Sequence, residues 1–130
     1  MTPTRRKRLV ALLTAALFAT GGAFAVPASA APCPSGSFCV WPDADFKGSV
    51  FASSGDDEWW DSWISDNDSS WANHGISGPG VKDHVVVYES AIQFPSDGGE
   101  RTICLAPGQE VASNANANDR GDAHVWAMQC

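Results

Sequence analysis

The chain has 130 residues, and its charges are unevenly distributed. All 15 acidic residues lie in 31–130 but only four of the eight basic ones do, so this part carries a net charge of −11 with histidine neutral. Such a surface repels phosphate backbones and anionic lipids, which excludes nucleic acids and membrane surfaces as favoured partners. Its length predicts one domain with a modest core.

The first 30 residues have the three parts of a secretory signal peptide. Basic residues occupy 5–8, an apolar stretch runs from 9 to 26, and the small-residue triplet Ala28-Ser29-Ala30 ends the segment. A membrane anchor is the alternative, but the stretch is short, contains Gly21-Gly22 and is followed by no stop-transfer pattern. We therefore expect cleavage after Ala30 and a secreted, extracellular domain over 31–130.

Strand signals dominate the domain. Short runs rich in β-branched or aromatic residues alternate with clusters of Gly, Pro, Asp, Asn and Ser. The runs are 37–41, 49–52, 84–88, 101–105 and 123–128. These runs predict an all-β domain.

One segment, 57–64, has the spacing of a short helical turn. It carries Trp59, Trp60, Trp63 and Ile64 on one face of such a turn. Because four large apolar groups are costly to expose in a small domain, we expect them in the core, with one indole at the rim.

A loose internal repeat divides the domain into two halves. Trp41 and Tyr88 follow similar strand-like runs 47 residues apart, and Asp66 and Asp119 begin similar polar segments 53 residues apart. Two copies of a β-unit of about 50 residues, each too small to close a core, are expected to pack face to face.

The four cysteines all lie in the exported part. They are Cys33, Cys39, Cys104 and Cys130. An even count in an exported chain predicts two disulfides, for which three pairings are possible. We favour Cys33–Cys39, which closes a tight loop, with Cys104–Cys130, which ties the last strand back to the domain. A zinc site with one of the three histidines is disfavoured, because neither C-x-x-C nor H-x-x-x-H spacing occurs.

Four segments resemble a known family. They are 33–41 (CPSGSFCVW), 45–48 (DFKG), 66–73 (DNDSSWAN) and 118–126 (NDRGDAHVW). Together they look like the actinobacterial peptidase inhibitor family I36, small secreted proteins with a βγ-crystallin-like double Greek-key fold. The resemblance implies an inhibitor rather than an enzyme, with an extracellular metallo- or serine protease as its partner. We expect a monomer that needs no cofactor.

Inhibition by a substrate-like segment requires an extended chain that is held rigid, so that binding costs little entropy. The segment 100–108 has suitable ingredients: Gly98-Gly99 precede it, Cys104 can anchor it, and Pro107-Gly108 stiffens its exit. The predicted reactive loop consists of Thr102, Ile103, Cys104, Leu105 and Ala106. A thermolysin-type metalloprotease would accept Leu105 after the scissile bond. An ordinary core strand and turn is the alternative interpretation.

Residues 65–70 resemble the calcium motif of the crystallins, two Asn or Asp residues, two free positions and then Ser/Thr-Ser. The candidate ligands are Asp66, Asn67, Asp68 and Ser70, whose hard oxygens suit Ca²⁺. Ser65 stands at the first motif position, and Asp122 and Ala123 replace the second copy's serines, so only low-affinity binding is expected. The alternative is a turn built by side-chain-to-backbone hydrogen bonds.

Other function classes stay open. A non-inhibitory crystallin-like binding module, for calcium or a glycan, would need donors or an exposed aromatic platform. A small secreted toxin could use the same scaffold. An enzyme is not expected, because the chain has no G-x-S-x-G, no H-E-x-x-H and, if both disulfides form, no free cysteine. The tripeptide Arg120-Gly121-Asp122 is interpreted as a turn rather than an adhesion motif.

Overall fold

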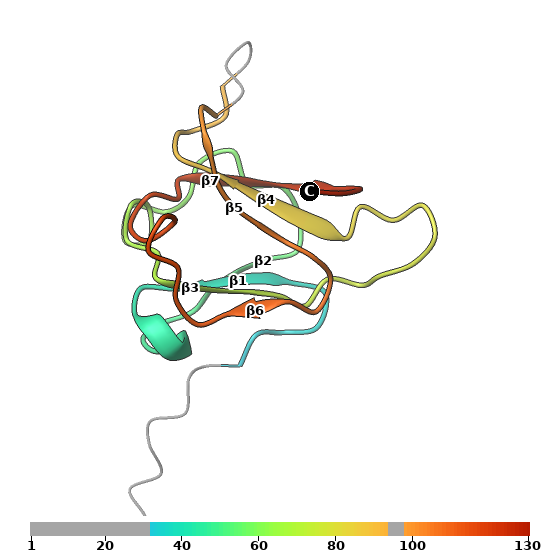
Figure 1. The fold of residues 1–130 in the computed structure, drawn as a ribbon, viewed down its shortest axis with the longest axis horizontal. Coiled ribbons are helices and arrows are strands. Elements are labelled where there is room, and N and C mark those ends of the chain that lie inside the picture. Colours follow the sequence, from blue (N-terminus) through green and yellow to red (C-terminus); the bar gives the residue numbers. More distant parts are fainter. Residues whose placement is uncertain (1–31, 94–97) are drawn as a thin grey trace, which may run out of the picture.

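Two antiparallel sheets face each other in the computed structural model, which describes residues 32–93 and 98–130 (Figure 1). The predicted signal peptide, 1–30, lies outside the described residues. The elements in chain order are β1 (Phe38–Trp41), the 3-10 turn η1 (Ala44–Phe46), β2 (Phe51–Ser53), β3 (Ser70–Asn73), β4 (His84–Tyr88), β5 (Arg101–Leu105), β6 (Glu110–Val111) and β7 (Ala123–Ala127). The all-β prediction is therefore confirmed.

The strand order shows that each half of the chain adds a backbone pairing to the sheet of the other half. The first sheet has the order β2-β1-β3-β6, and the second has the order β5-β4-β7. Strand β6 belongs to the second half but pairs with β3 of the first. In return, Asp57 of the first half forms a β-bridge with His124 of β7. Asp66 and Asp119, 53 residues apart, share a left-handed backbone, with φ of 54° and 58°. These features support the predicted duplication.

The core lies between the sheets because alternate residues of each strand point inward. Its buried members are Phe38, Val40, Phe51, Trp60, Ile64, Trp71, Val85, Val87, Leu105 and Ala117. The other face of β1 is covered as well: Trp41 packs edge-on against Phe46 of η1, with ring centroids 5.2 Å apart. Strand β1 is therefore buried along its whole length.

Both favoured disulfides are present. Cys33 is bonded to Cys39 and Cys104 to Cys130, so the described residues include no free cysteine. Bonds of this kind persist in oxidising compartments, which is consistent with secretion. Among the described residues, no helix is long and apolar enough to cross a membrane.

The helix predicted over 57–64 is wrong. This stretch contains the bridge at Asp57, and turns follow over 62–66. The backbone N–H of Trp60 donates to the carbonyl of Asp122 at 2.8 Å, across to the second half, rather than to a neighbouring turn. Within 32–93 and 98–130 the one short helical element is η1, and its Asp45 has φ of 59°. Tertiary hydrogen bonds thus override the local helical spacing.

The burial of the aromatic cluster was only partly predicted. Trp60 and Ile64 are in the core, at 2% and 0% exposure. Trp59 is 68% exposed and Trp63 is 42% exposed, so two indoles rather than one lie at the surface.

The two halves are also joined by a buried pair of rings. The indole Nε1–H of Trp60 donates to Nδ1 of His124 at 2.8 Å, and Nε2 of His124 lies 2.7 Å from the carbonyl of Gly55. Since Nδ1 accepts, the proton of the neutral ring is on Nε2. A second proton on Nδ1 would face the indole N–H. Burial lowers the pKa of His124.

This pair makes stability depend on pH. A histidine whose pKa is lower in the folded state stabilises the fold above its unfolded pKa, and that contribution is lost as pH falls through the folded pKa. We expect the free energy of unfolding to fall as pH drops below about 6.5. His124→Asn, which can still accept from Trp60, should flatten this slope in urea titrations. An unchanged slope would assign the acid sensitivity to other groups.

Candidate functional site

The predicted reactive loop is a strand at the edge of the second sheet. Residues 101–105 form β5, which pairs along one side with β4. Leu105 is 0% exposed within the core, and Ile103 packs against the same core. Thr102 and Cys104 alternate with them and therefore face outward. Within the predicted segment, Thr102, Cys104 and Ala106 are open to a partner. Leu105 is not, because it cannot leave the core without unfolding the domain.

A tight turn continues from β5. The N–H of Gln109 donates to the carbonyl of Ala106 at 3.0 Å, and the side-chain oxygen of Gln109 accepts from the N–H of Ala106 at 2.9 Å. Gly108 has φ of 75°, a conformation in which a side chain would be strained. Four residues, 106–109, are therefore fixed by their own hydrogen bonds.

Asn73 joins this turn to the rest of the domain. Its side chain is fully buried and donates to the carbonyls of Asp83 and Leu105, at 2.7 and 3.1 Å. Its backbone N–H donates to Gln109 and its carbonyl accepts from Gly108, both at 2.9 Å. One buried asparagine of β3 thus holds the end of β5 and its exit turn in place.

The segment is also anchored on its outer side. Cys104 is bonded to Cys130, and the guanidinium of Arg101 donates to the carbonyl of Cys130 at 3.1 Å. Strand pairing, a disulfide and the Asn73 contacts restrain one continuous segment from 101 to 109. This is the arrangement that a rigid, extended binding segment requires.

The polar segments of the two halves meet at Asp68. Its carboxylate is buried and accepts hydrogen bonds from the indole of Trp71 at 2.8 Å and from the N–H groups of Arg120 and Gly121 at 3.0 and 2.9 Å. Burial raises the pKa of Asp68, whereas these donors act in the opposite direction. Asp68 therefore links the polar segment of the first half to that of the second.

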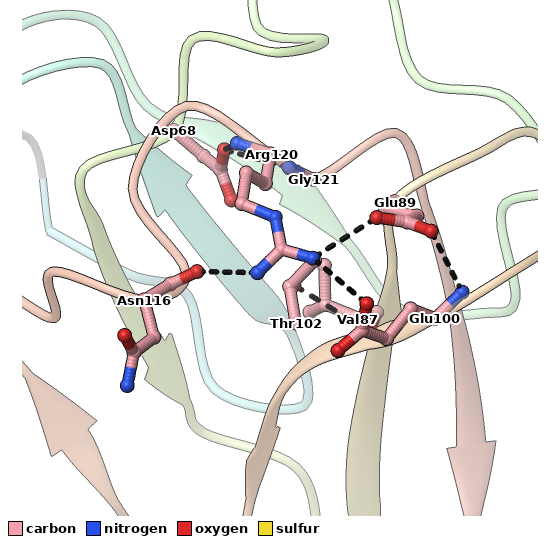
Figure 2. A network of polar contacts seen from close by, with 8 residues as sticks. All are labelled: Asp68, Val87, Glu89, Glu100, Thr102, Asn116, Arg120 and Gly121. Atoms are coloured by element: carbon pink, nitrogen blue, oxygen red, sulfur yellow. Dashed lines mark hydrogen bonds and ion pairs between the residues drawn. The ribbon is translucent and has the colours of Figure 1, made fainter.

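Arg120 extends the link to the β4–β5 hairpin (Figure 2). Its guanidinium contacts Glu89 at 2.9 Å and Glu100 at 3.4 Å, and donates to the carbonyl of Asn116 at 2.7 Å. The hydrogen bond from Arg120 lowers the pKa of Glu89. With Arg120 engaged and Gly121 buried, the tripeptide 120–122 is part of a structural turn, as interpreted from the sequence.

Three of the four candidate calcium ligands, Asn67, Asp68 and Ser70, make hydrogen bonds to other protein groups. The oxygens of Asp68 are occupied as described above. The hydroxyl of Ser70 accepts from the N–H of Phe46 and donates to the carbonyl of Asp43, at 3.0 and 2.7 Å. The amide of Asn67 donates to the carbonyl of Trp63. Within the described part of the chain no group of three or more His, Cys, Asp or Glu is placed to hold a metal. The contacts fit the alternative, a hydrogen-bonded turn, and calcium binding stays an untested prediction.

The two sheets face each other, and each half of the chain pairs with the sheet of the other half. This arrangement defines a βγ-crystallin-like double Greek-key protein. A βγ-crystallin from an archaeon matches with a TM-score of 0.53 and 21% identity, over 72% of this chain and 99% of that one. A structure from work on the evolution of the eye lens βγ-crystallin domain fold matches with a TM-score of 0.56 and 18% identity, over 73% and 89%. At these identities the likeness establishes the fold alone.

The family is narrower than the fold. The model of peptidase inhibitor family I36 matches residues 26–91, just over half of the chain, and the chain belongs to this family. No curated protein matches the chain. The family assignment supports a protease-inhibitor role rather than an enzymatic one, and it confirms the resemblance carried by the motifs of the first half.

Two structural residues of the site had no clear signal in the sequence. Asn73 ends the mostly polar stretch 65–73, which looks like a loop in the sequence. The last four residues of this stretch nevertheless form strand β3. Asp68 was considered as a metal ligand or as part of a hydrogen-bonded turn, not as a link between the two halves. A carboxylate three residues before a tryptophan, as in Asp68-x-x-Trp71, is a signal that could have indicated a buried hydrogen-bonded group.

Proposed function

We propose that the exported domain inhibits an extracellular metallo- or serine protease, with β5 and its exit turn acting as a rigid, substrate-like segment. The family assignment supports the class of activity. The observation that favours this segment is that, among the described residues, β5 pairs with another strand along one edge only, while it is held by β4, by the disulfide to Cys130 and by Asn73. Protease clefts bind extended chains, and an edge strand can pair with another chain.

The burial pattern supports a choice of contact residues within this proposed segment. Thr102 and Ala106 are partly exposed, whereas Leu105 belongs to the core. Replacing Leu105 with a charged residue would test folding rather than inhibition, because it buries an unpaired charge. Informative substitutions therefore lie at Thr102 and Ala106.

The test is a panel of secreted proteases, including thermolysin-type, subtilisin-type and trypsin-type enzymes, mixed with the disulfide-bonded domain 31–130. We expect inhibition of at least one class, and Thr102→Glu and Ala106→Glu should each raise its inhibition constant by about tenfold or more. Ser49→Glu and Ser113→Glu, exposed positions outside the segment, are the matched controls.

The outcomes separate the parts of the proposal. If no protease of the panel is inhibited at micromolar concentration, the function is wrong. If a protease is inhibited equally by the wild type and both segment variants, inhibition stands but the segment is wrong. The class of protease inhibited then identifies the target class.

A second candidate function, a non-inhibitory binding module, is favoured by one observation, the exposure of Trp59 and Trp63. An exposed aromatic pair is the platform that such a module requires.

A further inference from the structure

The segment between β2 and β3 carries two tryptophans on its surface. We call residues 57–67 the aromatic loop. Trp59 is 68% exposed and Trp63 is 42% exposed. Trp63 approaches the edge of Phe51 with ring centroids 6.5 Å apart. Large exposed aromatic side chains a few residues apart mark an interaction surface, because exposing them to water is costly.

The aromatic loop is held firmly, so its exposed indoles are presented from a fixed backbone. Asp57 exchanges two backbone hydrogen bonds with His124, at 3.0 and 2.9 Å. Trp60 and Ile64, which directly follow the exposed Trp59 and Trp63, are anchored in the core. The N–H of Trp59 is bound by the carboxylate of Asp57 at 3.0 Å. A partner would lose little entropy in ordering this surface.

The loop is strongly acidic. Its carboxylates belong to Asp57, Glu58, Asp61 and Asp66, and all four reach the surface at least in part. The sequence has no Lys or Arg between Lys47 and Lys82. The ion pairs found in the described residues involve none of these carboxylates. Their charge is therefore left for solvent or a partner to neutralise.

Residues 118–122, the polar segment of the second half, add negative charge beside the aromatic loop. The N–H of Asp66 donates to the carbonyl of Gly121 at 2.9 Å, which places Asp66 next to this segment. Partial burial raises the pKa of Asp66, and the nearby carboxylates of Asp122 and Asp119 raise it further. The guanidinium of Arg120 is bound to Glu89 and Glu100 instead, as Figure 2 shows.

We propose that the aromatic loop is a docking surface for an arginine-bearing segment of a partner protein. A guanidinium can stack on an indole face and donate paired hydrogen bonds to a carboxylate, so it uses both features of the surface. A lysine provides the charge but stacks less well. The loop is distant in sequence from β5, and this proposal does not rest on protease inhibition.

The test uses a blocked peptide in which arginine alternates with glycine, titrated into the domain 31–130 and followed by tryptophan fluorescence and calorimetry. We expect binding that weakens when salt is raised from about 20 mM to about 500 mM, since the exposed charges are then screened. The lysine analogue should bind more weakly. Trp59→Ala should weaken arginine-peptide binding about fivefold or more. Asp61→Asn should weaken binding of both peptides.

Matched controls separate the surface from general effects. Ile76→Ala removes an apolar side chain that is 72% exposed outside the loop, and Asp45→Asn removes an exposed carboxylate elsewhere; neither should change binding. Trp63→Leu, which keeps an apolar group near Phe51, is the second variant if Trp59→Ala fails to fold, and it should also weaken binding.

Four results would overturn the proposal. These are no binding of the arginine peptide at low salt, equal binding by wild type and the indole variants, or preferential binding of a chitin oligosaccharide at the same indoles. The fourth is self-association in size-exclusion chromatography that disappears with Trp59→Ala. Since no protease is present, failure here leaves the inhibitor proposal untouched.

Discussion

Replacing Asp68 with alanine is expected to lower the free energy of unfolding by about 4 kcal/mol. The substitution removes the acceptor of three donors, the buried indole of Trp71, the buried N–H of Gly121 and the partly buried N–H of Arg120. Hydrogen bonds to a charged group contribute about 1.5–3 kcal/mol each, and donors left unpaired in the interior cost more than donors in water. Since the donors come from both halves, the loss should weaken the whole fold.

Urea unfolding of the wild type, Asp68→Ala and Asp68→Asn measures this effect. Asparagine retains one acceptor oxygen but turns an NH₂ group toward one of the donors, so it should cost about half as much. Asn67→Ala is the matched control, because the neighbouring Asn67 is exposed and donates a single bond to the carbonyl of Trp63. If Asp68→Ala is no more destabilising than Asn67→Ala, Asp68 does not join the halves.

The strands that could be predicted from the sequence are those whose side chains alternate or are uniformly apolar. Strand β4, with Val85, Val86 and Val87, and β1, with Phe38 to Trp41, fall where the runs predicted them. Strand β3 was missed because Ser70 and Asn73 are polar residues typical of turns. Both are buried and satisfied by contacts far away in the chain. Such partners are visible only once the tertiary fold is known.

The restraints on segment 101–109 were predictable from the sequence, but the direction of its side chains was not. Gly98-Gly99, Cys104 and Pro107-Gly108 correctly bounded a restrained segment. Whether Leu105 points outward depends on the register of β5 with β4, since a shift by one residue reverses every side chain. The register pairs Val85 with Leu105, and both are in the core. The exposed Trp59 likewise follows closely after the bridge between Asp57 and His124, a contact between halves that no local pattern encodes.

Removing the disulfide between Cys104 and Cys130 should cost nearly as much as removing Asp68. The bond closes a loop with a sequence separation of 26, which predicts about 3.5 kcal/mol from chain entropy, compared with about 2 kcal/mol for the separation of 6 in Cys33–Cys39. Val86, the register partner of Cys104, points away from the core and is still only 1% exposed. The bonded C-terminal residues are therefore expected to shield that outer face.

Two double serine variants, one for each disulfide, test this difference in thermal unfolding, each being the control for the other. The Cys104→Ser/Cys130→Ser protein should have the lower Tm, and hydrogen exchange should rise at positions 86 and 104, on β4 and β5, before the first sheet is affected. The same variant should lose protease inhibition at temperatures where it is still folded, because β5 then lacks its outer anchor. The contacts of Asn73 with the end of β5 are the restraint that remains. Equal Tm values for the two variants would contradict the loop-length argument. Inhibition that survives in the folded Cys104→Ser/Cys130→Ser protein would instead show that strand pairing and Asn73 alone hold the segment rigid enough to bind.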